Sequence, residues 1–280
     1  MVGREEEAAG ASVVADLLVR GDDPGPGGGL LSITPERASW QFVGFDAIRL
    51  APGKTGTWRH SGREACIVLL SGGGELRAGS QTLDASDGRA SPFDGPPHAL
   101  YAPPGTEVAI TAGPRGLELA IGTAPATTGA AVQLFMPADA RLEIRGSGNT
   151  ERRIHHLLME DRFAERLLVT EVVTPGGNWS SYPPHKHDTD DPPRETQLEE
   201  LYYYRLRDPE RGFALQRVYT ADRSLDESVV ARDGDAVLVP RGFHTVSAPP
   251  GYDVYYLNVM AGPRREWKVT FDPDHERLRT

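Results

Sequence analysis

The 280-residue chain contains a single cysteine, Cys66, so an intrachain disulfide is impossible. Cys66 lies in the apolar run 65–70, which indicates a buried, unreactive thiol and a reducing compartment. The chain also lacks an apolar run long enough to span a membrane, and its N-terminus is acidic where a signal peptide would be basic. We therefore expect a cytoplasmic protein.

Basic residues are fewer than acidic residues in this chain. The chain has 30 Lys and Arg against 40 Asp and Glu, a net charge of −10 and a pI near 5.3. No basic stripe stands out, which argues against nucleic acid or an anionic membrane as partner. A small anionic substrate is compatible with this balance, because local arginines can override the global field.

Long helical periodicity is absent as well. Short apolar runs alternate with turn signals, which is typical of a β-sandwich or barrel. Residues 1–29 end in a Gly/Pro-rich run and are interpreted as a flexible lead-in. In each of the two halves that follow, a strand leads to a Pro/Gly turn, at 103–105 and at 240–242. We interpret this as an internal duplication, with an N-terminal barrel over 30–140 and a C-terminal barrel over 141–280.

Histidines and glutamates concentrate in the second half. His185 and His187 are one residue apart, so on an extended strand both imidazoles point the same way and can hold one ion. An aromatic strand follows, and its alternation allows only one of two adjacent glutamates to face the site; we choose Glu200. An apolar strand that stops at a Pro/Gly turn then presents His244. The predicted metal ligands are His185, His187, Glu200 and His244.

Three imidazoles and one carboxylate suit a single divalent ion such as Zn, Mn, Fe, Ni or Co, and they leave coordination positions open for substrate. A lone histidine in an apolar strand is more often a hydrogen-bonded structural residue, but the ordered combination favours a metal site. The first half has His60 and His98 without a His-x-His pair, so its barrel is expected to be metal-free. We expect one site per chain.

The segment joining the halves, 129–158, contains a glycine-rich loop with three arginines. Such a loop either faces an acidic ligand or is a solvated linker. The adjacent His155 and His156 point to opposite faces of a strand, so they cannot chelate one ion together.

These residues resemble those of the cupin superfamily, and specifically the bicupin 5-deoxy-glucuronate isomerases of myo-inositol catabolism, relatives of the 5-keto-4-deoxyuronate isomerases of pectin breakdown. The likeness covers nearly the whole chain after about Leu17. The strings that carry it are 177–188, 198–205, 234–244 and, upstream, 33–36 with Trp40 and 44–45.

Two features depart from the general cupin pattern. Twelve residues separate His187 from Glu200, far more than is usual, which leaves Glu195 and Glu199 as rival ligands. A single residue separates Gly242 from His244.

The resemblance implies two cupin barrels and a cytoplasmic, metal-dependent isomerase that converts 5-deoxy-D-glucuronate to 5-dehydro-2-deoxy-D-gluconate. The metal would act as a Lewis acid on the carbonyl and neighbouring hydroxyl oxygens. A base would carry the proton between carbons, unless a hydride shifts instead. The candidates for shuttling or positioning are Tyr202, Tyr204 and Lys186, although strand alternation turns Lys186 away from the metal face.

The substrate carboxylate calls for an arginine. Our candidates are Arg153, Arg205 and Arg241. Tyr203, on the opposite face of its strand from Tyr202, is interpreted as barrel core. Two other functions are compatible with a bicupin, an Fe(II) dioxygenase and a non-enzymatic sugar-binding protein, and a homo-oligomer is possible.

Overall fold

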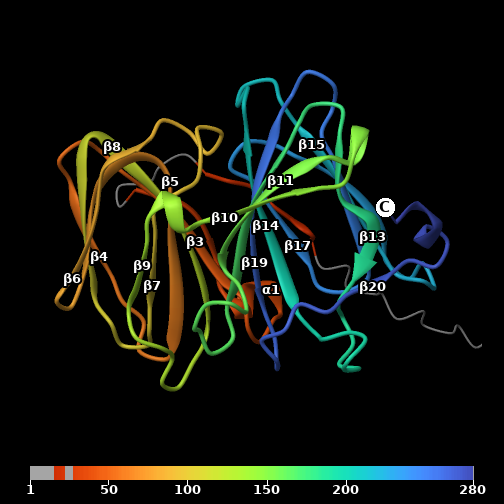
Figure 1. The fold of residues 1–280 in the computed structure, drawn as a ribbon, viewed down its shortest axis with the longest axis horizontal. Coiled ribbons are helices and arrows are strands. Elements are labelled where there is room, and N and C mark those ends of the chain that lie inside the picture. Colours follow the sequence, from red (N-terminus) through yellow and green to blue (C-terminus); the bar gives the residue numbers. More distant parts are fainter. Residues whose placement is uncertain (1–15, 23–27, 280) are drawn as a thin grey trace, which may run out of the picture.

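The computed structural model describes residues 16–22 and 28–279. Regular structure in these residues is nearly all β-strand, which confirms the all-β prediction. The strands form two barrels that lie side by side (Figure 1). The helical elements are short: α1 (Pro35–Ala38) and the 3₁₀ turns η1 (Pro137–Asp139), η2 (Gly148–Thr150) and η3 (Glu276–Leu278). Within the described ranges, no helix combines the length and the hydropathy required to cross a bilayer.

The N-terminal barrel is one continuous sheet with the strand order β2-β3-β8-β5-β7-β9, to which β4 and β6 add at β8 and β5. Two of its strands are long, because they run from one layer of the barrel into the other. The strands are β2 (Gly29–Ile33), β3 (Gly44–Leu50), β4 (Thr55–Trp58), β5 (Arg63–Ala78), β6 (Gln81–Arg89), β7 (Ala99–Ala102), β8 (Val108–Pro125) and β9 (Gln133–Phe135).

A run of glycines lets β5 change layers. Residues 71–74 have the sequence Ser-Gly-Gly-Gly, which is typical of a turn, but the structure continues β5 through them and shifts the β5–β8 register there. Gly72 has φ +86°, and a Cβ on Gly74 would lie 2.2 Å from the Thr111 carbonyl oxygen. Residues with side chains do not fit this bulge, so the glycines form a corner within one strand.

The C-terminal barrel consists of two sheets, ordered β1-β17-β14-β19-β12-β11-β10 and β16-β15-β18-β13-β20. Its first strand, β1 (Leu18–Val19), comes from the predicted lead-in and pairs with β17; the lead-in residues 1–15 and 23–27 lie outside the described residues. The remaining strands are β10 (Arg141–Arg145), β11 (Arg152–Leu158), β12 (Leu168–Thr174), β13 (Trp179–Lys186), β14 (Glu199–Leu206), β15 (Ala214–Tyr219), β16 (Asp226–Ala231), β17 (Ala236–Val239), β18 (Phe243–Ser247), β19 (Val254–Ala261) and β20 (Thr270–Phe271).

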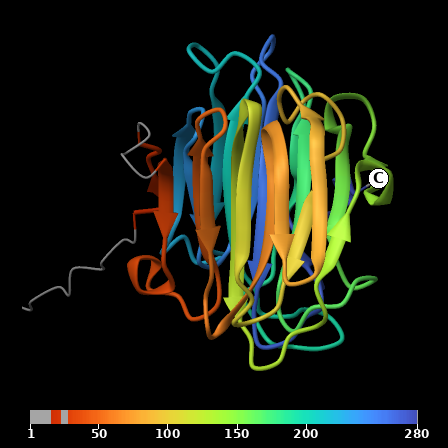
Figure 2. The same cartoon turned by 90° about the vertical axis from the view of Figure 1, so that its left-hand side faces the viewer.

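The two barrels pack sheet against sheet, with their strands nearly aligned (Figure 2). Phe45 of the first barrel meets Tyr203 of the second, with ring centroids 4.9 Å apart. Tyr203 therefore lies in the core between the barrels rather than inside one barrel. Gly122 permits the closest approach, because a Cβ there would lie 2.8 Å from the methyl carbons of Val259.

Two buried carboxylates add polar contacts to this interface. Glu171 forms a two-pronged ion pair with Arg89 across it, with N–O distances of 3.1 and 2.9 Å. Glu64 accepts hydrogen bonds from the backbone N–H groups of Glu165, Arg166 and Leu167. These directional contacts fix how one barrel sits on the other.

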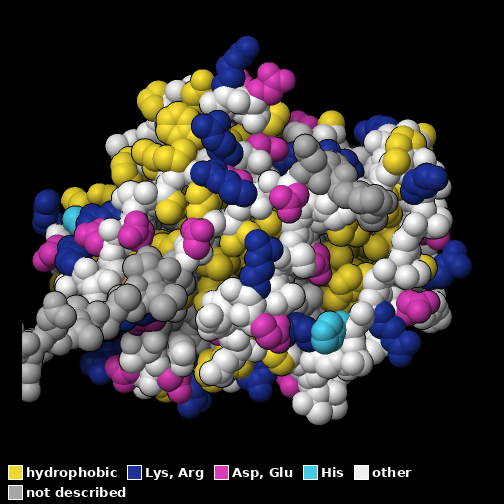
Figure 3. Space-filling view, turned by 180° about the vertical axis from the view of Figure 1, so that it is seen from behind, with side chains coloured by type: hydrophobic (Ala, Val, Ile, Leu, Met, Phe, Trp, Pro, Cys, Tyr) yellow, Lys and Arg dark blue, Asp and Glu magenta, His cyan; other side chains and the backbone are white. Residues whose placement is uncertain are grey.

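One face of the molecule carries mixed charge. On the face in Figure 3, Lys and Arg side chains are interspersed with Asp and Glu. This arrangement agrees with the absence of a basic stripe in the sequence.

Candidate metal centre

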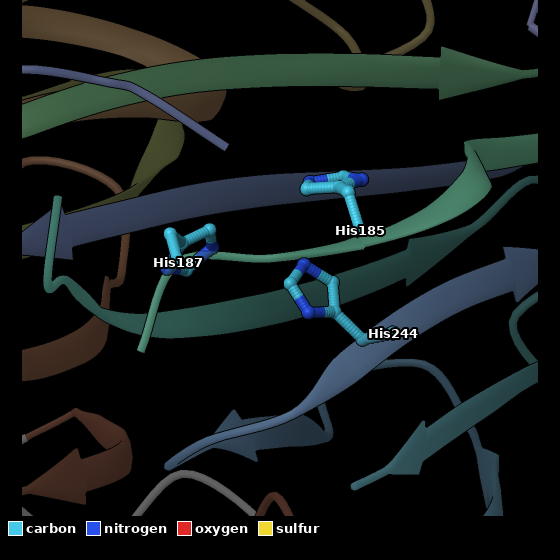
Figure 4. A group of neighbouring side chains, drawn as sticks. All are labelled: His185, His187 and His244. Atoms are coloured by element: carbon cyan, nitrogen blue, oxygen red, sulfur yellow. The ribbon is translucent and has the colours of Figure 1, made fainter. Parts of the chain in front are cut away.

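Three histidines converge inside the C-terminal barrel. His185 on β13 lies directly opposite His244 on β18, and His187 follows β13 by one residue. One ring nitrogen of each histidine lies within 4.8 Å of the others, and all three side chains are buried (Figure 4). The structure thus brings together the three histidines that the sequence selects.

Glu200 reaches the cluster from β14 in the facing sheet. Its Oε2 lies 2.9 Å from His187 Nε2 and 3.0 Å from His244 Nε2. Its Oε1 accepts a hydrogen bond of 2.8 Å from Asn258 Nδ2 on β19. This amide fixes the carboxylate orientation, as outer partners of metal ligands commonly do.

The rival glutamates are engaged elsewhere. Glu199 accepts hydrogen bonds from the backbone N–H groups of 41–43 in the first barrel. Glu195 binds Lys186 and the backbone N–H groups of Asp188 and Thr189. Glu200 is therefore the glutamate of the three that faces the histidines.

Backbone carbonyls fix the orientation of two of the rings. His187 Nδ1 lies 3.0 Å from the Leu198 carbonyl oxygen, and His244 Nδ1 lies 3.2 Å from that of Gly242. Because a carbonyl only accepts, each Nδ1 carries the hydrogen and each Nε2 is directed at Glu200. Although His244 Nε2 lies 3.0 Å from Glu200 Oε2, it is buried and forms no hydrogen bond with any atom of the described residues. A cation between these nitrogens and the carboxylate would satisfy all of them, so the donor set fits a divalent metal ion.

Burial and charge act together on the ionisation of this cluster. Burial and the neighbouring histidines lower the pKa of His185 well below its usual value, so its ring is a neutral donor. Burial alone would raise the pKa of Glu200, but His244 and His187 hold that pKa below its usual value. The carboxylate is therefore ionised, as a metal ligand must be.

Lys186, a catalytic candidate from the sequence, points away from the histidines. Its Nζ contacts Glu195 at 2.9 Å and also Asp188 and Thr189. Asp188 in turn accepts a hydrogen bond from the backbone N–H of Gly242, two residues before His244. Lys186 and Asp188 thus join the loop after β13 to the turn before β18 and hold the two ligand segments together.

Two adjacent cavities border the cluster. An inner one of about 30 Å³ touches His185, Glu200 and Tyr202, and an outer one of about 410 Å³ opens beside His185. The two share four lining residues: Arg145, Arg152, His185 and Trp267. His185 and Glu200 therefore give the cluster a border on a cavity that is also lined by arginines.

The N-terminal barrel has a larger cavity of about 640 Å³. It is lined partly by Arg49, which is paired with Glu118 at 2.9 Å, and its lining includes no histidine. The smaller cavities of the second barrel are the better candidates for the functional site, because they border the histidine cluster and the larger cavity does not.

The two tyrosines proposed as catalytic occupy different positions. Tyr202 borders the inner cavity, and its hydroxyl lies 3.0 Å from Ser181 Oγ. Burial and the charge of Glu200 raise the pKa of Tyr202 well above its usual value, so the phenol keeps its proton. Tyr204 donates to Gln216 Oε1 at 2.7 Å and does not line either cavity. Tyr202 is thus the tyrosine placed to contact a bound molecule.

The arginines selected from the sequence lie outside the two cavities. Arg205 pairs with Asp233 at 3.0 Å and with Glu118 of the first barrel, while Arg153 and Arg241 are exposed. Arg145 and Arg152, which the sequence analysis did not select, line both cavities. The sequence did contain a signal for Arg152: strand alternation places this residue on the same, inward side as the apolar Ile154. A role for Arg153, Arg205 or Arg241 in binding the carboxylate stays a prediction.

His155 and His156 belong to separate contacts, as expected from their opposite directions. His155 Nδ1 lies 2.7 Å from Glu171, and His156 Nε2 lies 2.8 Å from Glu143. Neither residue belongs to the histidine cluster found in the described residues.

Solved structures place the fold. A crystal structure of an IolB-like protein from Salmonella typhimurium LT2 superimposes with a TM-score of 0.90 at 42% identity, covering 94% of this chain and 99% of that one. The oxalate decarboxylase of Lactobacillus farciminis superimposes with a TM-score of 0.66 at 13% identity, over 93% of this chain and 89% of that one. The likeness to this second protein concerns the fold alone, and it confirms two tandem cupin barrels.

Curated sequence relatives carry the name of an activity. A protein of Geobacillus thermodenitrificans named 5-deoxy-glucuronate isomerase is 46% identical over 261 residues, or 93% of this chain and 94% of its own length. One of the same name from Halalkalibacterium halodurans is 42% identical over 87% of this chain and 90% of its own length. The model of the KduI/IolB family matches residues 17–278. The chain therefore belongs to the KduI/IolB family.

Proposed function

We propose that this protein is a metal-dependent aldose–ketose isomerase that converts 5-deoxy-D-glucuronate to 5-dehydro-2-deoxy-D-gluconate. One observation carries the proposal: a cluster of three buried histidines with Glu200, of which His185 and Glu200 border a cavity that Arg145 and Arg152 also line. The chain that holds this site is 46% identical, over 93% of its length, to a protein named for that activity.

The proposed metal ligands are His185, His187, Glu200 and His244. Their donors suit a divalent first-row ion such as Zn, Mn, Fe, Ni or Co. Such an ion, when bound, supplies Lewis-acid polarisation of an aldose carbonyl and its neighbouring hydroxyl. The ligands themselves are kept in place by the Leu198 and Gly242 carbonyls and by Asn258.

The remaining residues of the cavity orient the sugar acid and handle its protons. Tyr202 keeps its proton at neutral pH, so it acts as a hydrogen-bond donor to a substrate oxygen rather than as a base. Ser181, 3.0 Å from the Tyr202 hydroxyl, extends this hydrogen-bonded path. The small inner cavity beside Tyr202 and Glu200 limits water around the reacting carbons.

The test is an isomerase assay on 5-deoxy-D-glucuronate before chelation, after chelation and after the ion is restored. We expect the ketose product to form, to disappear with the ion and to return with it. His187→Ala should abolish activity, whereas His60→Ala, which removes an exposed histidine of the first barrel, should not.

Two outcomes separate the alternative functions. Oxygen consumption without ketose formation would favour the Fe(II) dioxygenase. Sugar binding without turnover by the ion-loaded protein would favour a binding role. Either result would reject the isomerase proposal.

A further inference from the structure

Arg152 is a buried cation that has no acidic partner in the described part of the chain. Its side chain belongs to the buried set, with 6% of the residue exposed, and no carboxylate oxygen of the described residues lies within 4.0 Å of its nitrogens. Buried charges in proteins are ordinarily paired, because removing an ion from water is costly. The missing anion is therefore a feature to explain.

The protein itself satisfies only part of this guanidinium. Nη1 donates to the Thr150 carbonyl at 3.0 Å, and Nη2 donates to the Tyr182 carbonyl at 3.3 Å. Arginine has five N–H donors, so donors remain for a further acceptor. Burial lowers the pKa of Arg152, because taking the guanidinium out of water disfavours its charged form.

Two other buried or half-buried arginines have more partners than Arg152. Arg89, equally buried, forms a two-pronged pair with Glu171. Arg265 has no carboxylate partner, but it donates to three backbone carbonyls at 2.6 to 2.9 Å and does not border the two cavities at the histidine cluster. Arg152 has fewer acceptors than Arg265 and borders both cavities.

The surroundings of Arg152 favour an anion that enters from the outer cavity. Arg145 lies at the same wall, partly neutralised by Glu143 at 2.7 Å and stacked over Trp267 with its guanidinium carbon 5.3 Å from the ring centroid. Arg279, exposed and stacked over Phe271, lines the outer cavity. Positive charge thus follows the path from the surface to His185.

We propose that Arg152 binds the carboxylate of the substrate, with Arg145 and Arg279 attracting it at the cavity mouth. The opposite, carbonyl end of an open-chain uronate then faces His185 and Glu200, which border the inner cavity together with Arg152. The choice of a uronate rests on the proposed function. The anion site itself rests on the contacts of Arg152, and it determines which end of the molecule reaches the metal ligands.

Two unreactive polyols test this site without turnover. L-gulonate and D-glucitol have the same carbon skeleton, but only L-gulonate carries a carboxylate, and neither has a carbonyl to isomerise. Calorimetric titration of the wild-type protein loaded with its ion should show L-gulonate binding about 10- to 100-fold more tightly, the range of a charge-assisted hydrogen-bonded pair. Equal affinities would overturn the proposal.

Variants then assign the effect to one residue. Arg152→Gln should remove the preference for L-gulonate and raise KM for 5-deoxy-D-glucuronate by about 10- to 100-fold, while Arg152→Lys should restore part of the preference. Arg141→Gln, which removes an exposed arginine of β10, is the control. A preference retained in a folded Arg152→Gln variant, as judged by circular dichroism, would overturn the assignment.

The two proposals fail separately. Binding of L-gulonate that depends on Arg152, in a protein that forms no ketose, rejects the isomerase and keeps the anion site. Ketose formation with an unchanged KM in Arg152→Gln keeps the isomerase and rejects the anion site.

Discussion

The two barrels share an architecture and differ in what fills them. The interior of the first is closed by aliphatic side chains of β5 and β8, among them Ile67, Leu69, Leu119 and Ile121. Strands β13, β14 and β19 of the second barrel instead contribute His185, Glu200, Tyr202 and Asn258 to a cavity beside the histidine cluster. A cupin barrel therefore becomes a candidate site through its inward-facing side chains, and the barrel without them serves as packing support.

This difference also bears on how the second barrel is stabilised. A polar interior contributes less hydrophobic stabilisation, since buried polar groups must be matched by hydrogen bonds. The second barrel buries the outer face of its larger sheet against the first barrel, where Leu201, Tyr203, Leu257 and Val259 are buried. We infer that the filled barrel stabilises the one that carries the cavity.

Breaking the polar contact between the barrels should have the largest effect. Arg89→Met leaves Glu171 buried without its cation, which should lower the free energy of unfolding by about 3–5 kcal/mol. Denaturant unfolding measures this loss. The double variant Arg89→Met/Glu171→Gln should lose less, because no uncompensated charge remains. A loss below about 1 kcal/mol in the single variant would contradict the supporting role of this contact.

A cavity in the first barrel should affect stability alone. Leu119→Ala removes a fully buried side chain and should cost about 2–5 kcal/mol in unfolding free energy. KM and metal content of the folded fraction should stay at wild-type values, because Leu119 does not border the histidine cluster. A change in metal content would contradict the view that the first barrel contributes only to stability while the second holds the metal site.

The tyrosines of β14 sharpen the comparison within the second barrel. Tyr202→Phe removes a hydroxyl that borders the inner cavity, so kcat should fall by about 100-fold. Tyr204→Phe removes a hydroxyl that contacts Gln216, so it should cost about 1 kcal/mol of stability with little change in kcat. Steady-state kinetics of both variants measures kcat, and thermal unfolding measures the change in stability. The reverse order of kcat effects would place Tyr204, not Tyr202, at the reacting atoms.

A smaller effect is expected at Asn258, which positions Glu200 without belonging to the proposed ligands. Asn258→Leu removes the hydrogen bond to Glu200 Oε1 and should weaken metal affinity by about 10- to 100-fold. Competition with a chelator of known affinity measures the dissociation constant. An unchanged constant would mean that the packing of β14 alone orients the carboxylate.

The sequence predicted some features of this molecule far better than others. Alternation and turn signals suffice for the all-β fold class and for directing His185 and His187 to one face, because strand direction is a local property. The turn before His244 marks this residue as a candidate, and its position opposite His185 is seen in the structure. Alternation also shows that only one of Glu199 and Glu200 can face the site, and the structure shows that it is Glu200. The glycines at 71–74 do not tell from sequence whether the chain turns or bulges there, because a bulge inside a strand and a turn between strands require the same residue type.

The arginines could not be ranked in the same way. Arg205 is an arginine near the predicted metal ligands, so the sequence makes it a candidate for binding a carboxylate. In the structure it pairs with Asp233 and with Glu118 of the first barrel, and the pair with Glu118 depends on how the two barrels dock. Arg152 lies in a segment that also reads as a linker, and its lack of an acidic partner appears only in the folded structure. Pairing across a fold is a non-local property, which a single sequence does not display.

The most direct test of the central claim is elemental analysis of purified wild-type protein, His187→Ala and His98→Gln. His98 is a buried histidine of the first barrel, which makes it the matched control. We predict about one divalent ion per chain in the wild type and in His98→Gln, in keeping with a single cluster of ligands, and none in His187→Ala. An ion retained in His187→Ala, or lost in His98→Gln, would contradict the assignment of the metal centre to the second barrel.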